Sequence, residues 1–375
     1  MLLSFISKRS IIPTFTQNFI KTSLNQSARS FTSTNSNSNS YTSSTGSSSS
    51  SWNSNNNKSY STSTSQPTSS QPPASTSASL NYDSALTTFT NYNVAVAYQP
   101  KNRKPSTNLF KKQNNNTAAL DSPTGEDNLF VTKQIQDGSI AIGVADGVGG
   151  WSEAGYDSSA ISRELCSHMK LNFEKDTSKN ITAKSILDES FKQILQSDKV
   201  EIGGTTACLG ILTSDLKLKV ANLGDSWCGL FRDYKLIKET NFQTHNFNTP
   251  YQLAKIPKHI LKKAEMEGRR YIIDSPNLAD EYEWDLKPND LIMFATDGVT
   301  DNVIPQDIEI FLKDELSEGD TELDIIAKKF VNEVVKVSKD SNYPSAFAQE
   351  LSRLTGQKYL GGKEDDVTIV LVKVL

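Results

Sequence analysis

The sequence predicts an α+β fold with antiparallel sheets. The expected strands and helices come in blocks rather than in alternating strand–helix–strand units, which argues against a doubly wound parallel sheet. Residues 216–220 alternate strictly between apolar side chains and lysine, as in an antiparallel strand with one solvated face. Two apolar runs also flank Asp137 and Gly138, a pair that is typical of a turn between strands.

The first predicted elements are two strands, two helices and three further strands. Residues 129–133 and 140–145 are the strands on either side of the turn. Apolar side chains at helical spacing predict a helix over residues 158–173, at Ile161, Leu165, Met169 and Phe173. A second helix is indicated by Ile186, Phe191, Ile194 and Leu195. Apolar runs then predict strands at residues 205–212, 216–223 and 226–232.

The rest of the chain contains one region without a clear pattern. Residues 242–273 give mixed signals, and we expect a loop there with a short helix near residues 260–267. The apolar run at residues 290–295 predicts a buried strand. Helices at residues 307–312 and 323–337 and a last strand at residues 367–374 complete the fold.

Composition separates an N-terminal part from a larger body. Residues 33–80 are almost all Ser, Thr, Asn, Gln, Pro and Gly, so they cannot bury enough apolar surface to offset the entropy of ordering. We therefore expect a disordered linker over residues 32–82. The part from Asp83 to the end is 293 residues long, which is enough for one sizeable core.

Charge divides at the same place. No Asp or Glu precedes Asp83, whereas the body from Asp83 onward holds 34 basic and 43 acidic residues, a net charge of −9. A nucleic-acid backbone needs clustered Lys and Arg, so nucleic acid is not the expected partner. An acidic body does suit a site for cations.

The cysteines indicate neither a zinc site nor a disulfide framework. Cys166, Cys208 and Cys228 form no CxxC pair and no cluster with histidine. An odd number in a long chain argues against disulfides, and we expect buried, reduced thiols.

The N-terminal residues 1–31 have the composition of a mitochondrial transit peptide. They hold no acidic residue and mix apolar, hydroxyl and basic residues, the last being Lys8, Arg9, Lys21 and Arg29. Lys8 and Arg9 interrupt the apolar run, which argues against a secretory signal, and the segment is too short and polar to span a bilayer. Residues 29–33 resemble a matrix-protease cleavage site with the cut after Phe31; an unstructured polar tail is the alternative.

Carboxylates stand at the ends of three predicted strands. Asp146 and Asp297 each follow an apolar run and precede a glycine, and Asp365 lies in an acidic cluster that leads into the last strand. Carboxylates at strand ends can converge where neighbouring strands finish, and Mg²⁺ and Mn²⁺ prefer such oxygen ligands. The pattern indicates a metal enzyme that acts on phosphate.

Each motif alone has a simpler interpretation. An Asp-Gly pair is most often a turn, because Gly supplies a positive φ. Glu126 with Asp127 could be ordinary solvated charge, and Asp365 with Asp366 a charged strand start. All of these interpretations must hold together for there to be no site.

Other hydrolase and nucleotide motifs are weak. Residues 203–206 (Gly-Gly-Thr-Thr) lack the Lys and the spacing of a P-loop, and Gly224-Asp225-Ser226 does not fit the G-x-S-x-G pattern. The histidines lie far from the acidic motifs in sequence, which disfavours a Ser-His-Asp hydrolase; they are His168, His245 and His259.

Taken in order, five motifs resemble those of the metal-dependent protein serine/threonine phosphatases, the PPM or type 2C family. They are residues 144–150 (VADGVGG), 203–206 (GGTT), 221–226 (ANLGDS), 295–298 (ATDG) and 365–368 (DDVT). The resemblance covers residues 91–375, which we expect to form the phosphatase domain. Trp151 and residues 247–253 (FNTPYQL) are similar to the mitochondrial branch of the family.

The resemblance implies a fold and a set of metal ligands. The family fold is an α-β-β-α sandwich, two stacked antiparallel sheets with helices on both outer faces. Asp146 matches the carboxylate that bridges two Mn²⁺ or Mg²⁺ ions and orients the nucleophilic water. The other matching ligands are Glu126 and the Gly147 carbonyl for one ion, and Asp297 and Asp365 for the other.

The residues beside these ligands are expected to support them. Asp127 would orient bound water, and Asp366, which stands where the family usually has Asn, would lie behind the ligands. Asp225 is interpreted as structural. Two departures from the family pattern leave the phosphate grip and the general acid unassigned: Ser122 replaces an Arg, and Val148 replaces a His.

The predicted reaction is hydrolysis of phosphoserine and phosphothreonine by a water that two metal ions activate, without a covalent phosphoenzyme. We expect the protein to be a monomer without a membrane span and to act on phosphoprotein substrates in the mitochondrial matrix. Two alternatives stay open: an inactive relative that binds phosphoproteins as a scaffold, and a phosphohydrolase for small phosphate esters.

Overall fold

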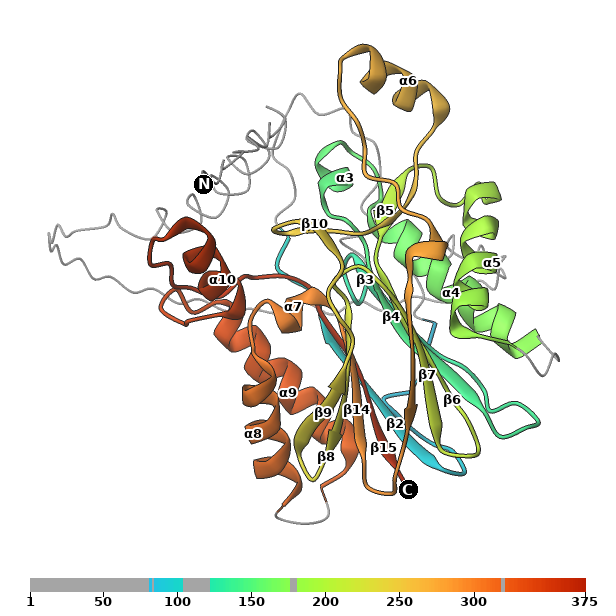
Figure 1. Ribbon diagram of the computed structural model, residues 1–375, viewed down its shortest axis with the longest axis vertical. Helices are drawn as coiled ribbons and strands as arrows, with labels where there is room; N and C mark the ends of the chain where they lie inside the picture. Colours follow the sequence, from blue (N-terminus) through green and yellow to red (C-terminus); the bar gives the residue numbers. More distant parts are fainter. Residues whose placement is uncertain (1–80, 83, 104–121, 176–180, 318–320) are drawn as a thin grey trace, which may run out of the picture. The chain divides into compact units, whose positions relative to one another are not determined.

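Two antiparallel sheets stack face to face, and helices cover the outer face of each sheet (Figure 1). The computed structural model describes residues 81–82, 84–103, 122–175, 181–317 and 321–375. The described residues all belong to one unit, Ser77–Leu375. This architecture confirms the predicted α+β sandwich. The predicted transit peptide and most of the predicted linker lie outside the described residues.

The first sheet has the strand order β13-β7-β6-β4-β3, with all neighbours antiparallel. Its strands are β3 (Asp127–Val131), β4 (Ile140–Asp146), β6 (Ala207–Leu212), β7 (Lys217–Leu223) and β13 (Asp280–Asp285). The predicted pair of strands around Asp137 and Gly138 is confirmed as the β3–β4 hairpin.

The second sheet has the order β1-β2-β15-β14-β8-β9 and is also antiparallel. Its strands are β1 (Leu86–Thr88), β2 (Tyr92–Gln99), β8 (Trp227–Arg232), β9 (Lys235–Glu239), β14 (Leu291–Ala295) and β15 (Val367–Val374). The chain therefore ends in the middle of this sheet, between β2 and β14.

Alternation of side chains along the strands builds three apolar layers. In β4, Ile142 and Val144 point into the core between the sheets, whereas Ala141 and Ala145 point toward the helices. The small alanines leave room for helices to approach, while the larger residues fill the space between the sheets. β15 has the same division, with Val370 and Val372 between the sheets and Ile369 and Leu371 under the helices.

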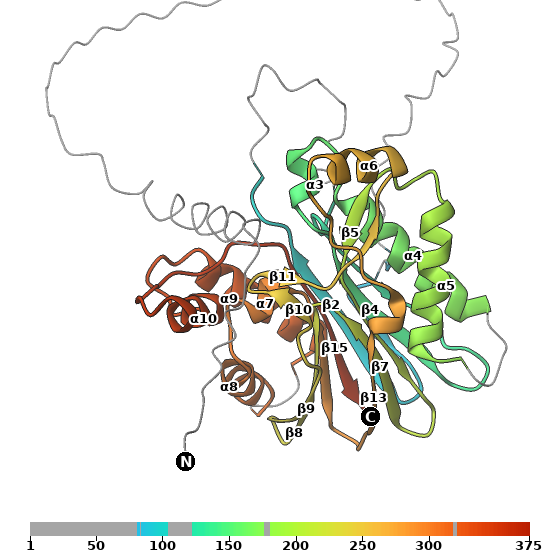
Figure 2. The same cartoon turned by 45° about the horizontal axis from the view of Figure 1, so that its top comes forward.

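Helices pack on both outer faces (Figure 2). α4 (Ser159–Lys175) and α5 (Ala183–Gln196) cover the first sheet, and α8 (Pro305–Leu316) and α9 (Leu323–Ser338) cover the second. Thr182 caps α5 by a reciprocal pair of hydrogen bonds with Ser185. No helix among the described residues has the length and apolar character needed to cross a membrane.

The remaining described elements are short. They are α3 (Gly150–Glu153), α7 (Asp297–Thr300), α10 (Ala346–Thr355), β5 (Gly203–Thr205), β10 (Thr244–Asn246), β11 (Thr249–Pro250), β12 (Leu253–Lys255), α6 (Lys258–Met266) and η1 (Pro276–Leu278). The short helix predicted near residues 260–267 is confirmed as α6. The three short strands that precede it were not predicted.

The prediction of one continuous strand over residues 205–212 is wrong. The strand is interrupted at Thr206, although the backbone N–H of this residue still donates to the Asp146 carbonyl at 2.9 Å. The Thr206 hydroxyl is shared with Ser226 at 2.7 Å. The predicted strand is therefore divided into β5 and β6, and β5 pairs with β12.

Candidate metal centre

The predicted acidic residues lie where strands of both sheets end. β3 begins at Asp127 and β4 ends at Asp146, and these two residues are opposite each other in the hairpin. In the second sheet, Asp297 begins α7 directly after β14, and Asp365 lies just before β15. The Thr296 hydroxyl donates to Asp127 Oδ2 at 2.8 Å and so joins the two sheets. Carboxylates far apart in sequence are therefore brought together.

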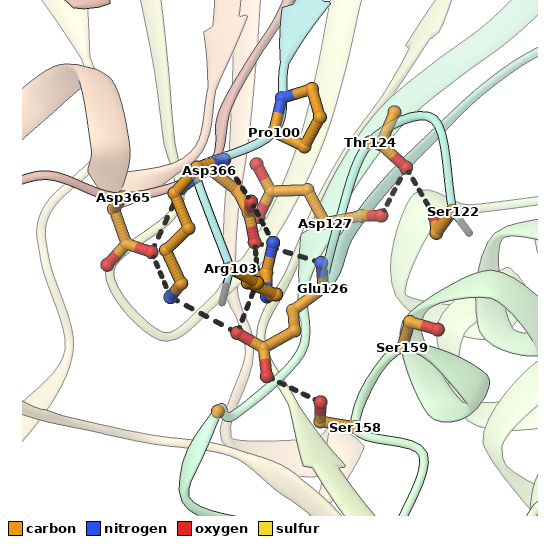
Figure 3. A network of polar contacts seen from close by, with 12 residues as sticks. Pro100, Arg103, Ser122, Thr124, Glu126, Asp127, Ser158, Ser159, Asp365 and Asp366 are labelled. Carbon is orange, nitrogen blue, oxygen red and sulfur yellow. Dashed lines mark hydrogen bonds and ion pairs between the residues drawn. The ribbon is translucent and has the colours of Figure 1, made fainter. Parts of the chain in front are cut away.

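Glu126 is buried and held by two basic groups that follow β2. Its Oε2 lies 2.7 Å from Arg103 Nη2 and 3.2 Å from Lys101 Nζ, and the Ser158 hydroxyl donates to its Oε1 (Figure 3). Arg103 also forms an ion pair with Asp366. Asp366 Oδ2 accepts the Glu126 N–H at 2.9 Å. Asp366 thus holds both the Glu126 backbone and the Arg103 side chain that pairs with Glu126.

A second group of carboxylates surrounds Lys363. Its Nζ lies 2.8 Å from Asp297 Oδ2 and 3.8 Å from Asp365 Oδ2, and it forms a further ion pair with Asp301. The same Nζ donates to Asn248 Oδ1 at 3.2 Å. A positive charge is therefore held where three carboxylates from two elements meet.

The two central carboxyl groups repel each other and their neighbours. Burial raises the pKa of Asp146 well above its usual value, and charge repulsion from Asp297 and Asp127 adds to the shift. The pKa of Asp127 is raised by burial and by repulsion from Asp366. Such a cluster favours any cation that can offset the repulsion.

Glu126 and Asp365 have shifts of the opposite sign. Burial alone would raise the pKa of Glu126, but Lys101 and Arg103 outweigh burial and hold the pKa below its usual value. In the same way, Lys101 and Lys363 lower the pKa of Asp365 against the effect of burial. Both groups are therefore ionised acceptors at neutral pH.

Asp225 joins this cluster from the turn between β7 and β8. Its Oδ1 is buried and has no hydrogen-bond partner among the described residues. Burial raises its pKa well above the usual value, as does repulsion from Asp297 and Asp301. Burial and Asp297 also raise the pKa of Asp301 to about 7, although Lys363 acts against this shift. A buried carboxyl oxygen without a partner in the protein fits a bound cation or water.

Close approach of backbone explains the glycines that follow the two aspartates. A Cβ on Gly147 would lie 2.5 Å from the Ser158 carbonyl oxygen and 2.7 Å from that of Glu126. A Cβ on Gly298 would collide with the Asp366 carbonyl. Neither glycine has a positive φ, so the interpretation of these pairs as simple turns is wrong.

The donor set fits divalent hard cations. It consists of carboxylate and backbone oxygens, the ligands that Mg²⁺ and Mn²⁺ prefer. As the side chains stand, no three acidic, His or Cys residues in the described ranges form a ready-made site. The basic groups of Lys101, Arg103 and Lys363 lie among the carboxylates. The partnerless Asp225 oxygen and the mutually repelling carboxyls are the features that fit bound cations.

Three basic residues and two acids of the centre were not predicted as site residues. Lys363 is only weakly indicated by the sequence, as a basic residue that stands directly before the acidic residues leading into β15. Lys101 and Arg103 had none, because the pairing of β2 with β15 that brings them to Asp365 and Asp366 is a long-range contact. Asp225 lies within a predicted motif but was interpreted as structural, and Asp301 follows the motif at residues 295–298.

Histidines and cysteines lie elsewhere in the described structure. His245 pairs with Asp274 at 2.9 Å and stacks on Tyr251, which leaves it outside the acidic cluster. Cys166, Cys208 and Cys228 are free and buried, as predicted. Burial raises the pKa of each thiol, so these groups are poor nucleophiles.

Comparison with known proteins gives consistent similarities. The family model described as Stage II sporulation protein E (SpoIIE) matches residues 136–375. The chain is 52% identical over 289 residues to "Protein phosphatase 2C homolog 7, mitochondrial" of Saccharomyces cerevisiae. The alignment covers 76% of this chain and 82% of that protein. It is 33% identical to "Protein phosphatase PTC7 homolog fig" of Drosophila ananassae, over 67% of this chain and 73% of that protein.

A solved structure shares the fold. The X-ray structure of the photosystem II phosphatase PBCP aligns with a TM-score of 0.59 and 24% sequence identity. The alignment covers 76% of this chain and 99% of that chain.

Proposed function

This chain belongs to the type 2C family of protein phosphatases, and from that premise we propose that its acidic centre binds two Mn²⁺ or Mg²⁺ ions and hydrolyses phosphoserine and phosphothreonine in proteins. The observation that carries the proposal is the meeting of acidic residues from both sheets at one end of the sandwich. Their mutual repulsion and the partnerless Asp225 oxygen support bound cations at this place.

Each ligand has a place in the proposed site. Glu126, Asp146 and the Gly147 carbonyl would hold one ion, and Asp146, Asp297 and Asp365 the other. Bound divalent ions would lower the pKa of a shared water and offset the negative charge of the phosphoryl group.

The surrounding side chains keep the ligands in position. The Thr296 hydroxyl donates a hydrogen bond to Asp127, a carboxylate that would orient bound water. The Thr206 hydroxyl accepts the Asp146 N–H at 3.1 Å and fixes the backbone beside the bridging carboxylate. The Asp366 carboxylate accepts hydrogen bonds from the Lys101 N–H, at 2.8 Å, and from the Glu126 N–H. It thereby connects the segment after β2 to the start of β3.

The substrate class is tested by comparing phosphopeptides with small phosphate esters. In Mn²⁺, we expect phosphoserine and phosphothreonine peptides to be hydrolysed with a higher kcat/KM than phosphotyrosine peptides or small esters. A protein substrate can use binding energy away from the phosphate, which a small ester cannot. Faster hydrolysis of a small ester than of every phosphopeptide would instead identify a small-molecule phosphohydrolase. Binding of phosphopeptides without any turnover would identify an inactive scaffold.

We further propose that the protein works in the mitochondrial matrix. The proposal is supported by the basic, acid-free composition of residues 1–31 and by the name of the yeast relative. Residues 1–40 fused to a fluorescent reporter should direct it to mitochondria, and protease protection after outer-membrane rupture should place it in the matrix. A control fusion with Lys8, Arg9, Lys21 and Arg29 changed to Gln should stay in the cytosol. Diffuse fluorescence of the unchanged fusion would contradict the proposal.

A further inference from the structure

A basic surface lies on and just after α6, within a body that is acidic overall. It consists of Lys258, Lys262, Lys263 and Arg270, all exposed, and we call it the α6 basic surface. None of these four side chains forms an ion pair with an acid in the described part of the chain. Arg269 is excluded from the set because it pairs with Glu267. With Glu265 as the other exposed acid, residues 258–270 hold five basic and two acidic side chains and keep a positive balance.

The backbone around α6 is anchored to the candidate metal centre. β12, which leads into α6, pairs with β5, and Lys255 is opposite Gly203. β5 in turn bridges to the centre, because Thr205 is opposite Gly147 and the Val148 N–H donates to the Gly204 carbonyl at 2.8 Å. The basic surface is therefore one strand pair away from a proposed metal ligand.

The chain after α6 returns to the same place. The Tyr271 ring stacks on Trp151 of α3, with 5.4 Å between ring centroids. Asp274 then accepts the Gln252 N–H at 2.9 Å and pairs with His245. α3 begins at Gly150, shortly after Asp146 and Gly147, and both α3 and α6 lie toward the same end of the fold in Figure 2. Contacts before and after α6 thus tie this segment to the chain that follows the two proposed metal ligands.

The outer face of α6 is polar rather than apolar. Ala264 is buried, and Ile260 and Leu261 are partly buried, so the apolar side of the helix is already covered. Among the large apolar side chains of α6, Met266 is highly exposed, at 81%. An amphipathic helix that binds a lipid surface needs a free apolar face as well as basic residues. The composition therefore favours an acidic polypeptide over a membrane.

We propose that the α6 basic surface binds acidic residues near the phosphorylated residue of the substrate, so that the enzyme prefers acidic phosphoproteins; this inference rests on the proposed phosphatase function. The centre would fix the phosphate, and an extended segment, at roughly 3.3 Å per residue, would carry flanking Asp and Glu toward α6. Complementary charge at the rim of a site raises the encounter rate and selects among partners, and salt weakens both effects.

The test compares charge reversal at α6 with the same change elsewhere. Lys262→Glu/Lys263→Glu reverses two adjacent exposed lysines in α6. Lys313→Glu/Lys328→Glu is the matched control, because it reverses two exposed lysines that form no ion pair among the described residues, one in α8 and one in α9, in the helical layer over the second sheet. Full-length proteins in Mn²⁺ are assayed on a phosphoserine peptide flanked by Asp and Glu, on the same peptide with Asn and Gln, and on p-nitrophenyl phosphate.

We expect the α6 variant to lower kcat/KM for the acidic peptide roughly tenfold at low salt, mainly through KM. Its activity on the neutral peptide and on p-nitrophenyl phosphate should stay unchanged, which also shows that the variant folds. High salt should remove most of the difference, and the control variant should match the wild type on all three substrates.

Three outcomes would overturn the inference. One is an equal change, or none, on the acidic and neutral peptides. Another is loss of binding to anionic lipid vesicles in the α6 variant without any change in peptide kinetics, which would assign the surface to a membrane. If the wild type hydrolyses none of the three substrates in Mn²⁺, the proposed phosphatase function itself fails.

Discussion

Asp146→Asn is expected to remove phosphatase activity and leave the fold intact. The side chain keeps its size but loses the charge that would bridge both ions. We expect kcat to fall roughly a thousand-fold, which corresponds to about 4 kcal/mol of lost transition-state stabilisation. The ionised Asp146 is disfavoured by burial and by Asp297, so the neutral amide should not destabilise the metal-free protein.

Two measurements on matched variants check this expectation. Asp137→Asn changes the same residue in another Asp-Gly pair, where Asp137 lies exposed in the β3–β4 turn, and it should keep wild-type activity. Melting temperatures in EDTA should show Asp146→Asn to be at least as stable as the wild type. Near-normal turnover by Asp146→Asn would remove that residue from the reaction.

Removal of divalent metal is expected to abolish activity in the wild type. Asp146, Asp225 and Asp297 lie in one cluster of carboxyl groups. Among the described residues, Lys363 forms an ion pair with Asp297, whereas no basic residue forms an ion pair with Asp146 or Asp225. Turnover should vanish in excess EDTA and return with Mn²⁺ or Mg²⁺, and zinc should not be required because the centre presents oxygen ligands. Unchanged turnover after thorough chelation would contradict metal-assisted hydrolysis.

Stability gives a readout of the same metal that does not depend on activity. A carboxyl whose folded pKa is raised stabilises the fold below its unfolded pKa, near 4, and loses that contribution as pH rises through the folded pKa. Asp146 and Asp225 have raised pKa values, and that of Asp301 is about 7. Without metal, the melting temperature should therefore fall between pH 5 and about pH 8 through these groups.

Added Mn²⁺ should act most strongly at the upper end of that range. Metal ligands must be deprotonated, so binding also strengthens as pH rises. The difference in melting temperature between Mn²⁺ and EDTA should thus be larger at pH 8 than at pH 6. In Asp146→Asn the difference should shrink at both values. A difference that is independent of pH would show that these carboxyls do not take part in binding.

The sequence predicts much of the sandwich because its core strands carry their own pattern. The alternation in β7 and the apolar runs of β4, β14 and β15 are local, so they are readable without the fold. β13 was missed because its sequence, DEYEWD, is mostly acidic. Only Tyr282 and Trp284 face the core, and long-range pairing with β7 decides its conformation.

The candidate site follows the same division between local and long-range information. The predicted acids Asp146, Asp297 and Asp365 follow or precede strands, and strand ends are visible in sequence. The basic groups among them are not, because Lys101 reaches Asp365 only through the pairing of β2 with β15. The pKa values of the acids depend on these contacts, and so no sequence pattern could have supplied them.

A crystal structure of the protein grown with Mn²⁺, with anomalous data collected at the manganese edge, is the most direct test of the proposed two-metal centre. Two manganese peaks are expected, about 4 Å apart. Asp146 should lie between them, with Glu126 and the Gly147 carbonyl on one and Asp297 and Asp365 on the other. Density without manganese among these oxygens, with Lys101 and Lys363 still paired to them, would contradict this proposal.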